Sequence, residues 1–548
     1  YLQQPTMTTT SVSTAAGDDN DDSSPINLLK DSQTLHSLQN PPQRLFPNNH
    51  EDDFFSNPSD LTPQEIANHL FLNSEILAPM VRASTTPLRT LALSHGASLV
   101  YTEELVDRSI TSPTERIIND ELGTIDYRVP KHTYSAKVQR RLENDRDNPD
   151  AANGAVILRI DPTVERHKLI YQMGTGEPNL ALDAALTVVR DVDGLDVNMG
   201  CPKKFSVSGG MGSALLGDMN RACDIIKTLR RNIGCNKPVS AKIRLLDEEN
   251  PKPTVDFVRN LVKAGANAIA IHGRIRGDES HIMARWETLI NVVKELKMYG
   301  DVNVPIIING DLYTREDIRE MKRRTGCDGV MLARPALYNI SLFNRGKEEE
   351  KEGDGVGKAG GSNNDGEEEE EVPISQFQQT NHSGHYGYKS PLLHSRTSIV
   401  QEYIAHCVRY RTHSKNAKYV VCEMMNARRA PSTRVPYLNM EYEGGQNIAS
   451  VCKCRNLNDL IKVWDCKWTI PMPSAKSSAA LSGDGGDGVE AQGDLHNYDD
   501  RYFLDHDKFR KERSDALNEQ LSLSKKMSAS IGEEKKDDDA PSSKRPKI

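Results

Sequence analysis

The stretch VSAKIRLLDEENPKPTVDFVRNLVKAGANAIAIHG (residues 239–273) carries the pattern that decides the fold. Two short apolar runs, at 239–245 and 268–273, flank an amphipathic segment that ends at Gly265. Continuous apolar runs are typical of strands buried on both faces, and a glycine after an amphipathic segment is typical of a helix end. The stretch therefore predicts a strand, a helix and a second strand of one parallel sheet.

The same unit recurs along the chain. Further apolar runs are ILAPM (76–80), SLVYTEE (98–104), KLIYQMG (168–174), GLDVNMG (194–200), PIIING (305–310) and GVMLAR (329–334). Thr314 and Asp317 have the spacing of a capping box, and Gly326 ends the same predicted helix. Eight strand units within about 260 residues match a (β/α)8 TIM barrel, with a doubly wound open sheet as the competing α/β fold.

Composition divides the rest of the chain. The hydrophobic fraction is 37% and the mean hydropathy is −0.60 over 548 residues, which is low for one continuous globule. We expect five parts: a disordered tail (1–70), the barrel (71–344), an acidic low-complexity insert (345–390), a small all-helical domain (391–470) and a mostly disordered tail (471–548).

Charge is distributed unevenly between these parts. Residues 1–60, 345–371 and 471–548 carry −7, −7 and −3, so the rest of the chain is near +8 although the whole chain is −9. A basic folded part suits a polyanionic partner, although basic side chains on an amphipathic helix are also commonly just its solvated face. The helical segment supplies Arg409, Arg411, Lys415, Lys418, Arg428 and Arg429.

Several classes of protein are disfavoured. The nine cysteines are irregularly spaced, which indicates a reducing compartment and no disulfide framework. We expect no metal, with a zinc site at Cys452, Cys454 and Cys466 as the alternative. No apolar run approaches the roughly 18 residues of a membrane span. We further expect a monomer in the cytoplasm, with the terminal SKRPKI as a candidate nuclear signal; the chain starts at Tyr1, so this reading would miss an upstream targeting segment.

Polar side chains end strand after strand. Beside the apolar Met80, these strand ends supply Glu104, Gln172, Asn198, Lys242, His272, Arg274, Asn309, Asp311 and Arg334. Burying such groups without partners costs free energy, and barrel sites form where the strands finish, so the pattern predicts a cofactor pocket. Gly310 and the Ala333–Arg334 turn follow the last two strands, where barrels commonly bind a phosphate. Since no strand precedes GxGxxG, FMN is favoured over a dinucleotide.

The loop VNMGCPKKFSVSGGMGSALL (197–216) follows the fourth predicted strand. Its glycines permit conformations that larger residues resist. An unperturbed thiol, with a pKa of about 8.5, is mostly protonated at neutral pH, so Cys201 is a candidate proton donor. The alternative is a small buried hydrophobe.

At this point the residues match a known family. APMVRASTTPLRTLAL, YTEEL, NMGCPKKFSVSGGMGSALL, AKIRLL, IHGRIRG, INGD and GVMLARPAL resemble the tRNA-dihydrouridine synthases, in particular the eukaryotic branch that acts on uridine 20 of the tRNA D loop. The likeness covers about residues 74–344 and is weaker over 398–429.

The resemblance implies that FMN, re-reduced by NADPH, reduces a tRNA uridine to 5,6-dihydrouridine. Cys201 would be the general acid at C5 of the uracil, Asn198 and Arg274 would bind the substrate, and the helical domain would bind tRNA. Residues that would contact FMN are Ala78, Pro79, Met80, Glu104, Gln172, Lys242, His272, Asn309, Gly310, Asp311, Ala333 and Arg334.

Two alternatives stay open at this point. One is another FMN barrel oxidoreductase that acts on a free pyrimidine, as dihydroorotate dehydrogenases do. The other is a tRNA-binding protein that keeps the barrel without redox activity.

Overall fold

The computed structural model describes residues 61–144, 150, 154–233, 236–345, 394–426 and 445–466. All of them belong to one of the two units into which the chain divides. The predictions for residues 1–60, for nearly all of the acidic insert, for Arg428 and Arg429, and for the C-terminal tail with SKRPKI lie outside the described residues.

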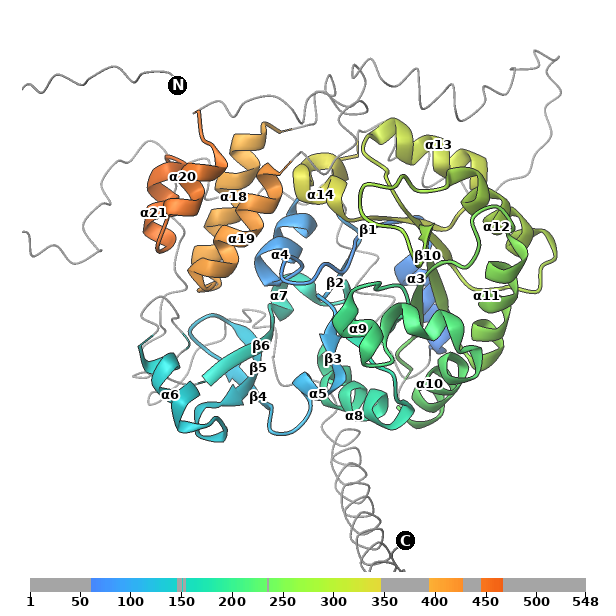
Figure 1. Cartoon of the computed structure of the whole chain (residues 1–548), viewed down its shortest axis with the longest axis horizontal. Helices are drawn as coiled ribbons and strands as arrows, with labels where there is room; N and C mark the ends of the chain where they lie inside the picture. Colours follow the sequence, from blue (N-terminus) through green and yellow to red (C-terminus); the bar gives the residue numbers. More distant parts are fainter. Residues whose placement is uncertain are drawn as a thin grey trace, which may run out of the picture. The chain divides into compact units, whose positions relative to one another are not determined.

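Eight parallel strands form a closed barrel (Figure 1). They are β1 (Ser74–Leu77), β2 (Leu99–Tyr101), β7 (Leu169–Gly174), β8 (Gly194–Asn198), β9 (Val239–Leu245), β10 (Ala268–Ile275), β11 (Ile306–Asn309) and β12 (Gly329–Leu332). The ring closes because β1 pairs with β12, and β2 pairs with both β1 and β7. Each strand coincides with one predicted apolar run, so the TIM barrel is confirmed and the open sheet was wrong. A short β3 (Leu105–Val106) adds to the edge of β7.

Helices cover the outside of the barrel (Figure 1). The longer ones are α4 (Thr86–Ser94), α8 (Pro178–Val188), α10 (Met219–Asn232), α11 (Lys252–Ala264), α12 (Trp286–Met298) and α13 (Arg315–Thr325). Short helical turns are α5 (Asp107–Ile110), α7 (Pro162–Glu165), η4 (Val189–Asp191), α9 (Lys204–Ser208), η5 (Gly212–Gly217), α14 (Arg334–Tyr338) and η6 (Ile340–Phe343). The predicted capping box at Thr314 is present, and Gly265 and Gly326 end their helices with positive φ.

A helix, α3 (Pro63–Phe71), begins inside the segment predicted as a tail, so the boundary at residue 70 was wrong. Thr62 and Glu65 form a capping box around Pro63, a start signal that was readable in the sequence. Ile66, Leu70 and Phe71 join the core cluster inside the barrel. Gln64 also donates to the carbonyl of Asn267, just before β10 begins. The helix therefore covers the end of the barrel where the strands start and leaves the opposite end for a site.

The connection from β3 to β7 forms a separate antiparallel sheet that the sequence analysis missed. It contains β4 (Glu115–Asn119), β5 (Thr124–Pro130) and β6 (Gly154–Ile160), with η2 (Lys131–Thr133) and α6 (Ala136–Glu143) between β5 and β6. Arg and Asp interrupt the apolar runs in these strands. The search for continuous buried runs passed over them for that reason.

Among its described residues, the segment predicted to be helical contains four helices: α18 (Arg396–Arg409), α19 (Ser414–Met425), α20 (Ile448–Lys453) and α21 (Leu457–Val463). Helix α18 packs against α4 of the barrel. Polar contacts join the two: Thr90 and His406 share a hydrogen bond of 2.8 Å, and His95 Nε2 donates to Glu402 over 2.7 Å.

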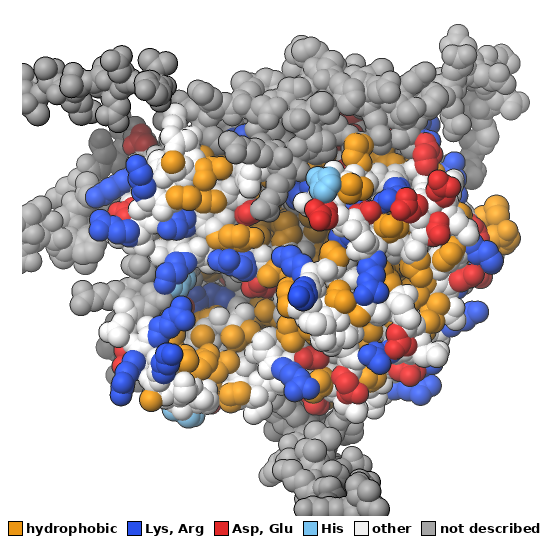
Figure 2. All heavy atoms as spheres, viewed as in Figure 1, with side chains coloured by type: hydrophobic (Ala, Val, Ile, Leu, Met, Phe, Trp, Pro, Cys, Tyr) orange, Lys and Arg blue, Asp and Glu red, His pale blue; other side chains and the backbone are white. Residues whose placement is uncertain are grey.

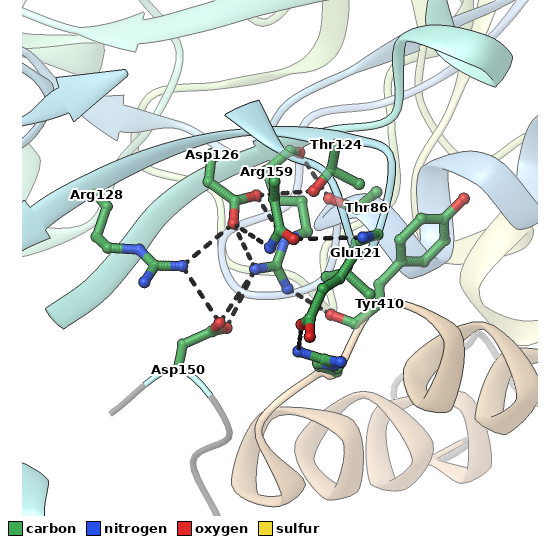
Figure 3. A network of polar contacts seen from close by, with 11 residues as sticks. Thr86, Glu121, Thr124, Asp126, Arg128, Asp150, Arg159 and Tyr410 are labelled. Atoms are coloured by element: carbon green, nitrogen blue, oxygen red, sulfur yellow. Dashed lines mark hydrogen bonds and ion pairs between the residues drawn. The ribbon is translucent and has the colours of Figure 1, made fainter. Parts of the chain in front are cut away.

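The sheet and the helical elements are also joined (Figure 3). Arg159 on β6 binds Asp126 with two hydrogen bonds of 2.7 Å and donates to the carbonyl of Tyr410, which follows α18. The Tyr410 hydroxyl donates to Asp161 over 2.7 Å. These buried polar groups are satisfied only while barrel, sheet and helices stay together. In the part of the chain that the structure describes, no helix is both long and apolar enough to cross a membrane.

Candidate active site

Asn198, the last residue of β8, shapes the turn that carries Cys201. Its side-chain oxygen accepts from the backbone N–H of Gly200 (3.0 Å) and of Cys201 (2.9 Å). Its side-chain nitrogen donates to Gln172 Oε1 over 3.0 Å. Asn198 was predicted to hold the substrate. In the structure, both its side-chain oxygen and its side-chain nitrogen form hydrogen bonds within the protein, and these bonds position Cys201.

A buried hydrogen-bond chain continues behind this turn. Gln172 donates to Asp196 over 2.7 Å, and Ser240 donates to the other oxygen of Asp196 over 2.6 Å. Burial raises the pKa of Asp196 to about 6, against the opposing effects of Ser240, Gln172 and Lys242. Gln172, which was predicted to contact FMN, is fully buried. Its amide hydrogen-bonds with Asp196 and Asn198, so it joins β7 to β8.

Cys201 lies beside Glu104, which comes from the link between β2 and β3. The Glu104 carboxyl group interacts electrostatically with the thiol and accepts from Ser206 Oγ on α9 over 3.4 Å. Burial, and next the negative charge of Glu104, raise the pKa of the Cys201 thiol. The thiol is therefore protonated at neutral pH, as a proton donor must be, and it is only partly buried.

Lys242 on β9 faces the same place. It interacts electrostatically with Asp196, Cys201 and Glu104, while burial and the neighbouring Arg244 lower its pKa to about 8. The side chain is enclosed by protein yet keeps some accessible surface, as expected of a residue that lines an enclosed space. Cys201 and Lys242, predicted to share one site, are thus brought together from adjacent strands.

A second cluster forms at the ends of β10, β11 and β12. Arg274 and Arg334 each bind Asp311 with a shortest distance of 2.7 Å, and Arg274 Nη1 lies 3.0 Å from His272 Nε2. Burial, and then Lys242, Arg244, Arg274 and Arg334, lower the pKa of His272 well below its usual value. Because one carboxylate faces several cations, the cluster carries surplus positive charge. Arg274, predicted to hold the substrate, is 4% exposed and lies within this cluster.

The other predicted cofactor residues lie at the same end of the barrel. Ala78 N–H donates to Leu332 O over 2.9 Å, and Met80 N–H donates to Ser84 Oγ over 3.1 Å, with Pro79 between them. Asn309 donates to the carbonyl of Met331 over 2.7 Å. Gly310 has φ +139°, and a Cβ there would lie 2.8 Å from Ala284 Cβ. Ala333 directly precedes α14, whose first residue is Arg334.

Sequence reasoning missed Arg244. It donates to the carbonyls of Ile275 (2.8 Å) and Asp278 (3.1 Å), and its charge lowers the pKa of both Lys242 and His272. The signal was present, because Lys242 and Arg244 are two residues apart in one strand and so share a face.

One other group in the described part of the chain has the composition of a metal site. The ligand atoms of His95, His394 and Glu402 all lie within 4.8 Å of one another. The His95–Glu402 hydrogen bond already satisfies two of these groups. The described cysteines Cys452, Cys454 and Cys466 are free and do not form such a group with other described residues.

Comparisons with known proteins fit this geometry. The family model for dihydrouridine synthase (Dus) matches residues 150–359. The tRNA-dihydrouridine(20) synthase [NAD(P)+] of Saccharomyces cerevisiae is 35% identical over 285 residues, which are 51% of this chain and 68% of the yeast protein. The chain belongs to the dihydrouridine synthase family. The resemblance stated from the motifs is confirmed.

Other relatives extend the comparison. The tRNA-dihydrouridine(20) synthase [NAD(P)+] of Schizosaccharomyces pombe is 35% identical over 282 residues, so this dihydrouridine synthase family member spans about half of that relative's length (52%). Among solved structures, DHODH from Eimeria tenella in complex with ferulenol has 16% identity and a TM-score of 0.32, over 56% of this chain and 92% of that one.

Proposed function

We propose that this chain reduces uridine to 5,6-dihydrouridine in the D loop of tRNA, at position 20, with FMN as its flavin and NADPH as the reductant. Membership of the dihydrouridine synthase family supports the reaction, and the names of the two yeast relatives support the position and the use of NAD(P). The observation that carries the proposal is the meeting of the protonated Cys201 thiol with Lys242 at one end of a closed barrel.

The residues at this end fit a flavin that carries one phosphate. The surplus positive charge around His272 favours a phosphate dianion, which would offset the repulsion among the cations. Gly310 adds a backbone surface that a Cβ would obstruct, next to the start of α14. We assign Ala78 to Met80, Lys242, His272, Asn309 to Asp311, Ala333 and Arg334 to FMN, and we add Arg274 to this group because it binds Asp311. When bound, reduced FMN supplies the hydride that adds to C6 of the uracil.

Cys201 supplies the proton. Hydride addition at C6 leaves negative charge that spreads from C5 to the C4 carbonyl oxygen. The S–H bond of Cys201 breaks, a C5–H bond forms and the sulfur becomes a thiolate. Lys242, whose ammonium faces the sulfur, stabilises that thiolate. Asn198 holds the turn so that the thiol keeps its place, which makes it a positioning residue.

The helical elements are the proposed tRNA-docking surface. Lys and Arg side chains gather over them and over the three-stranded sheet on the face in Figure 2. Two of the predicted cations form ion pairs with residues of the β4–β6 region. Arg409 lies 3.1 Å from Asp161, which directly follows β6, and Arg411 lies 2.6 Å from Glu121, between β4 and β5. A polyanionic partner would compete with Glu121 for Arg411, because that pair is exposed, so we expect tRNA binding to weaken steeply with salt.

One experiment separates this function from the alternatives. Purified protein should bind FMN, NADPH should bleach the flavin, and unmodified tRNA should then speed its reoxidation, whereas uracil and orotate should not. An equal response to a free pyrimidine would favour the other class of FMN barrel enzyme. Absence of NADPH bleaching in flavin-loaded protein would favour the non-catalytic tRNA-binding protein.

The Cys201→Ala variant tests the assigned proton donor. We expect it to retain FMN and its reduction by NADPH, while dihydrouridine formation falls by about 10²–10⁴-fold, the usual contribution of a positioned general acid. Cys223→Ala is the matched control, because Cys223 is buried in α10, away from the site. Loss of bound flavin from Cys201→Ala would contradict the assigned role.

A further inference from the structure

We infer that Glu104 is the proton relay of Cys201: its carboxyl group holds the thiol in its protonated form and returns a proton to the sulfur after each turnover. The inference deepens the proposed function and rests on it. It also replaces the flavin contact that the sequence predicted for Glu104.

Three side chains meet in this part of the site. Glu104 is 7% exposed, its carboxyl group accepts from Ser206 Oγ over 3.4 Å, and Ser206 Oγ and Cys201 Cβ both lie against Gly212. They come from the β2–β3 link, the turn after β8 and helix α9, so the barrel itself brings them together. A largely buried carboxyl group beside a thiol, with the Ser206 hydroxyl next to both, is placed to exchange a proton with that thiol.

Two glycines keep the carboxyl group in place. A Cβ at Gly174 on β7 would lie 2.8 Å from Glu104 Oε1, so the strand backbone closes directly over the carboxyl group. A Cβ at Gly212, whose φ is +57°, would lie 2.4 Å from Ser206 Oγ and 3.0 Å from Cys201 Cβ. These close approaches leave Glu104 little freedom to turn away from the sulfur.

The charges that face this pair are consistent with a relay. Lys203 and Lys242 face Glu104, and Lys242 and Arg244 also face Cys201. Burial nevertheless raises the pKa of Glu104 above its usual value, which brings the carboxyl group closer to accepting a proton at neutral pH. Lys242 interacts electrostatically with both groups, so it stabilises whichever member of the pair is negative.

The proton balance is simple. The thiol gives its proton to C5 of the uracil and becomes a thiolate. The Glu104 carboxylate then accepts a proton from solvent and transfers it to sulfur, which restores the S–H bond and leaves Glu104 as a carboxylate again. Since a carboxylic acid is more acidic than a thiol, the transfer to sulfur is downhill, and it leaves Glu104 in the ionised form from which the next cycle begins. No oxidation or reduction accompanies these steps.

The first test reads the thiol without using the reaction. Iodoacetamide alkylation of Cys201, followed by mass spectrometry of the peptide that contains it, gives the pH midpoint at which the thiolate forms. In Glu104→Gln the negative neighbour is lost, so we expect the midpoint to fall by about one unit and alkylation near neutral pH to speed up about tenfold. Glu103→Gln is the matched control, because Glu103 accepts from Arg82 N–H. An unchanged or higher midpoint in Glu104→Gln would overturn the inference.

The second test follows repeated turnover. In Glu104→Gln we expect bound FMN and its reduction by NADPH to stay within twofold of wild type. Repeated turnover with tRNA should slow by about 10²-fold or more, and Glu104→Asp should recover part of the rate. Loss of flavin from both variants would restore the predicted flavin contact and overturn the relay, as would normal repeated turnover. Failure of the proposed function is distinguishable, because wild-type protein would then form no dihydrouridine whatever the alkylation result.

Discussion

Asn198 illustrates, at the scale of one residue, how the site is built. Its amide holds two backbone N–H groups of the turn that carries Cys201 and also reaches Gln172 on the neighbouring strand. The turn then continues to Gly212, where the backbone adopts a positive φ of 57°. The position of the thiol thus depends on one amide before it and one glycine after it.

Gly212→Ala should therefore displace Cys201. The new Cβ would lie 2.7 Å from the Cys201 carbonyl oxygen, and the left-handed conformation would cost about 1–3 kcal/mol. We expect dihydrouridine formation to fall more than tenfold, with a small decrease in the midpoint of thermal unfolding. Gly277→Ala, where a Cβ meets no atom within 4 Å, is the control and should leave both quantities unchanged. Wild-type activity in Gly212→Ala would show that the turn tolerates a side chain.

At the scale of elements, the three-stranded sheet connects the barrel to the helical elements through buried hydrogen bonds. Arg159 on β6 supports this arrangement, because its guanidinium binds Asp126 within the sheet and the carbonyl of Tyr410 outside it (Figure 3). Its own carbonyl accepts from Arg89 and Thr86 on α4. One residue thus contacts three elements.

Replacing Arg159 with Met should loosen this junction. A buried Asp126 would lose its main partner, and breaking a buried ion pair in this way costs about 3–5 kcal/mol. Amide hydrogen exchange at Tyr410 to Thr412 should speed up more than exchange in the barrel strands. Arg128→Met is the matched control, because Arg128 lies 3.3 Å from Asp126 and from Asp150. Its replacement should therefore have a smaller effect. Equal exchange at this segment in both variants would contradict the role of Arg159 in connecting the sheet to the helical elements.

At the scale of the whole molecule, Glu75 joins the beginning of the barrel to its end. This carboxylate on β1 binds Arg315 at 2.6 Å and lies 3.4 Å from Lys322 and from Arg345. Burial alone would raise the pKa of Glu75, but the three cations lower it to about 2. The charged form therefore stabilises the fold above the unfolded pKa, near 4.5, and this stability is lost as the pH falls toward 2.

Glu75→Gln should change how stability depends on acid. We expect its free energy of unfolding in urea to be lower than that of wild type at pH 6, by roughly 3 kcal/mol, and to fall less steeply between pH 4.5 and pH 2.5. Glu287→Gln is the control, because Glu287 is 61% exposed and should leave the curve unchanged. Parallel curves for Glu75→Gln and wild type would refute this account.

Local sequence patterns predicted the barrel because each strand is a continuous apolar run that can be recognised without its neighbours. The polar ends of these runs also predicted that Cys201, Lys242 and His272 would meet, since the ends of parallel strands converge in any barrel. The pairing of Arg159 with Tyr410, 251 residues away, left no comparable local signal. The roles of Asn198 and Glu104 were equally hidden, because their partners depend on how one turn folds back on its strand.

The hydrogen bonds between α4 and α18 bear on any attempt to exchange the helical elements among relatives. A grafted helical module without these partners would leave buried polar groups of the recipient without a hydrogen bond. The pairs are Thr90 with His406, His95 with Glu402 and Asp161 with Tyr410. Chimeras that exchange these helices should therefore transplant these pairs as matched sets.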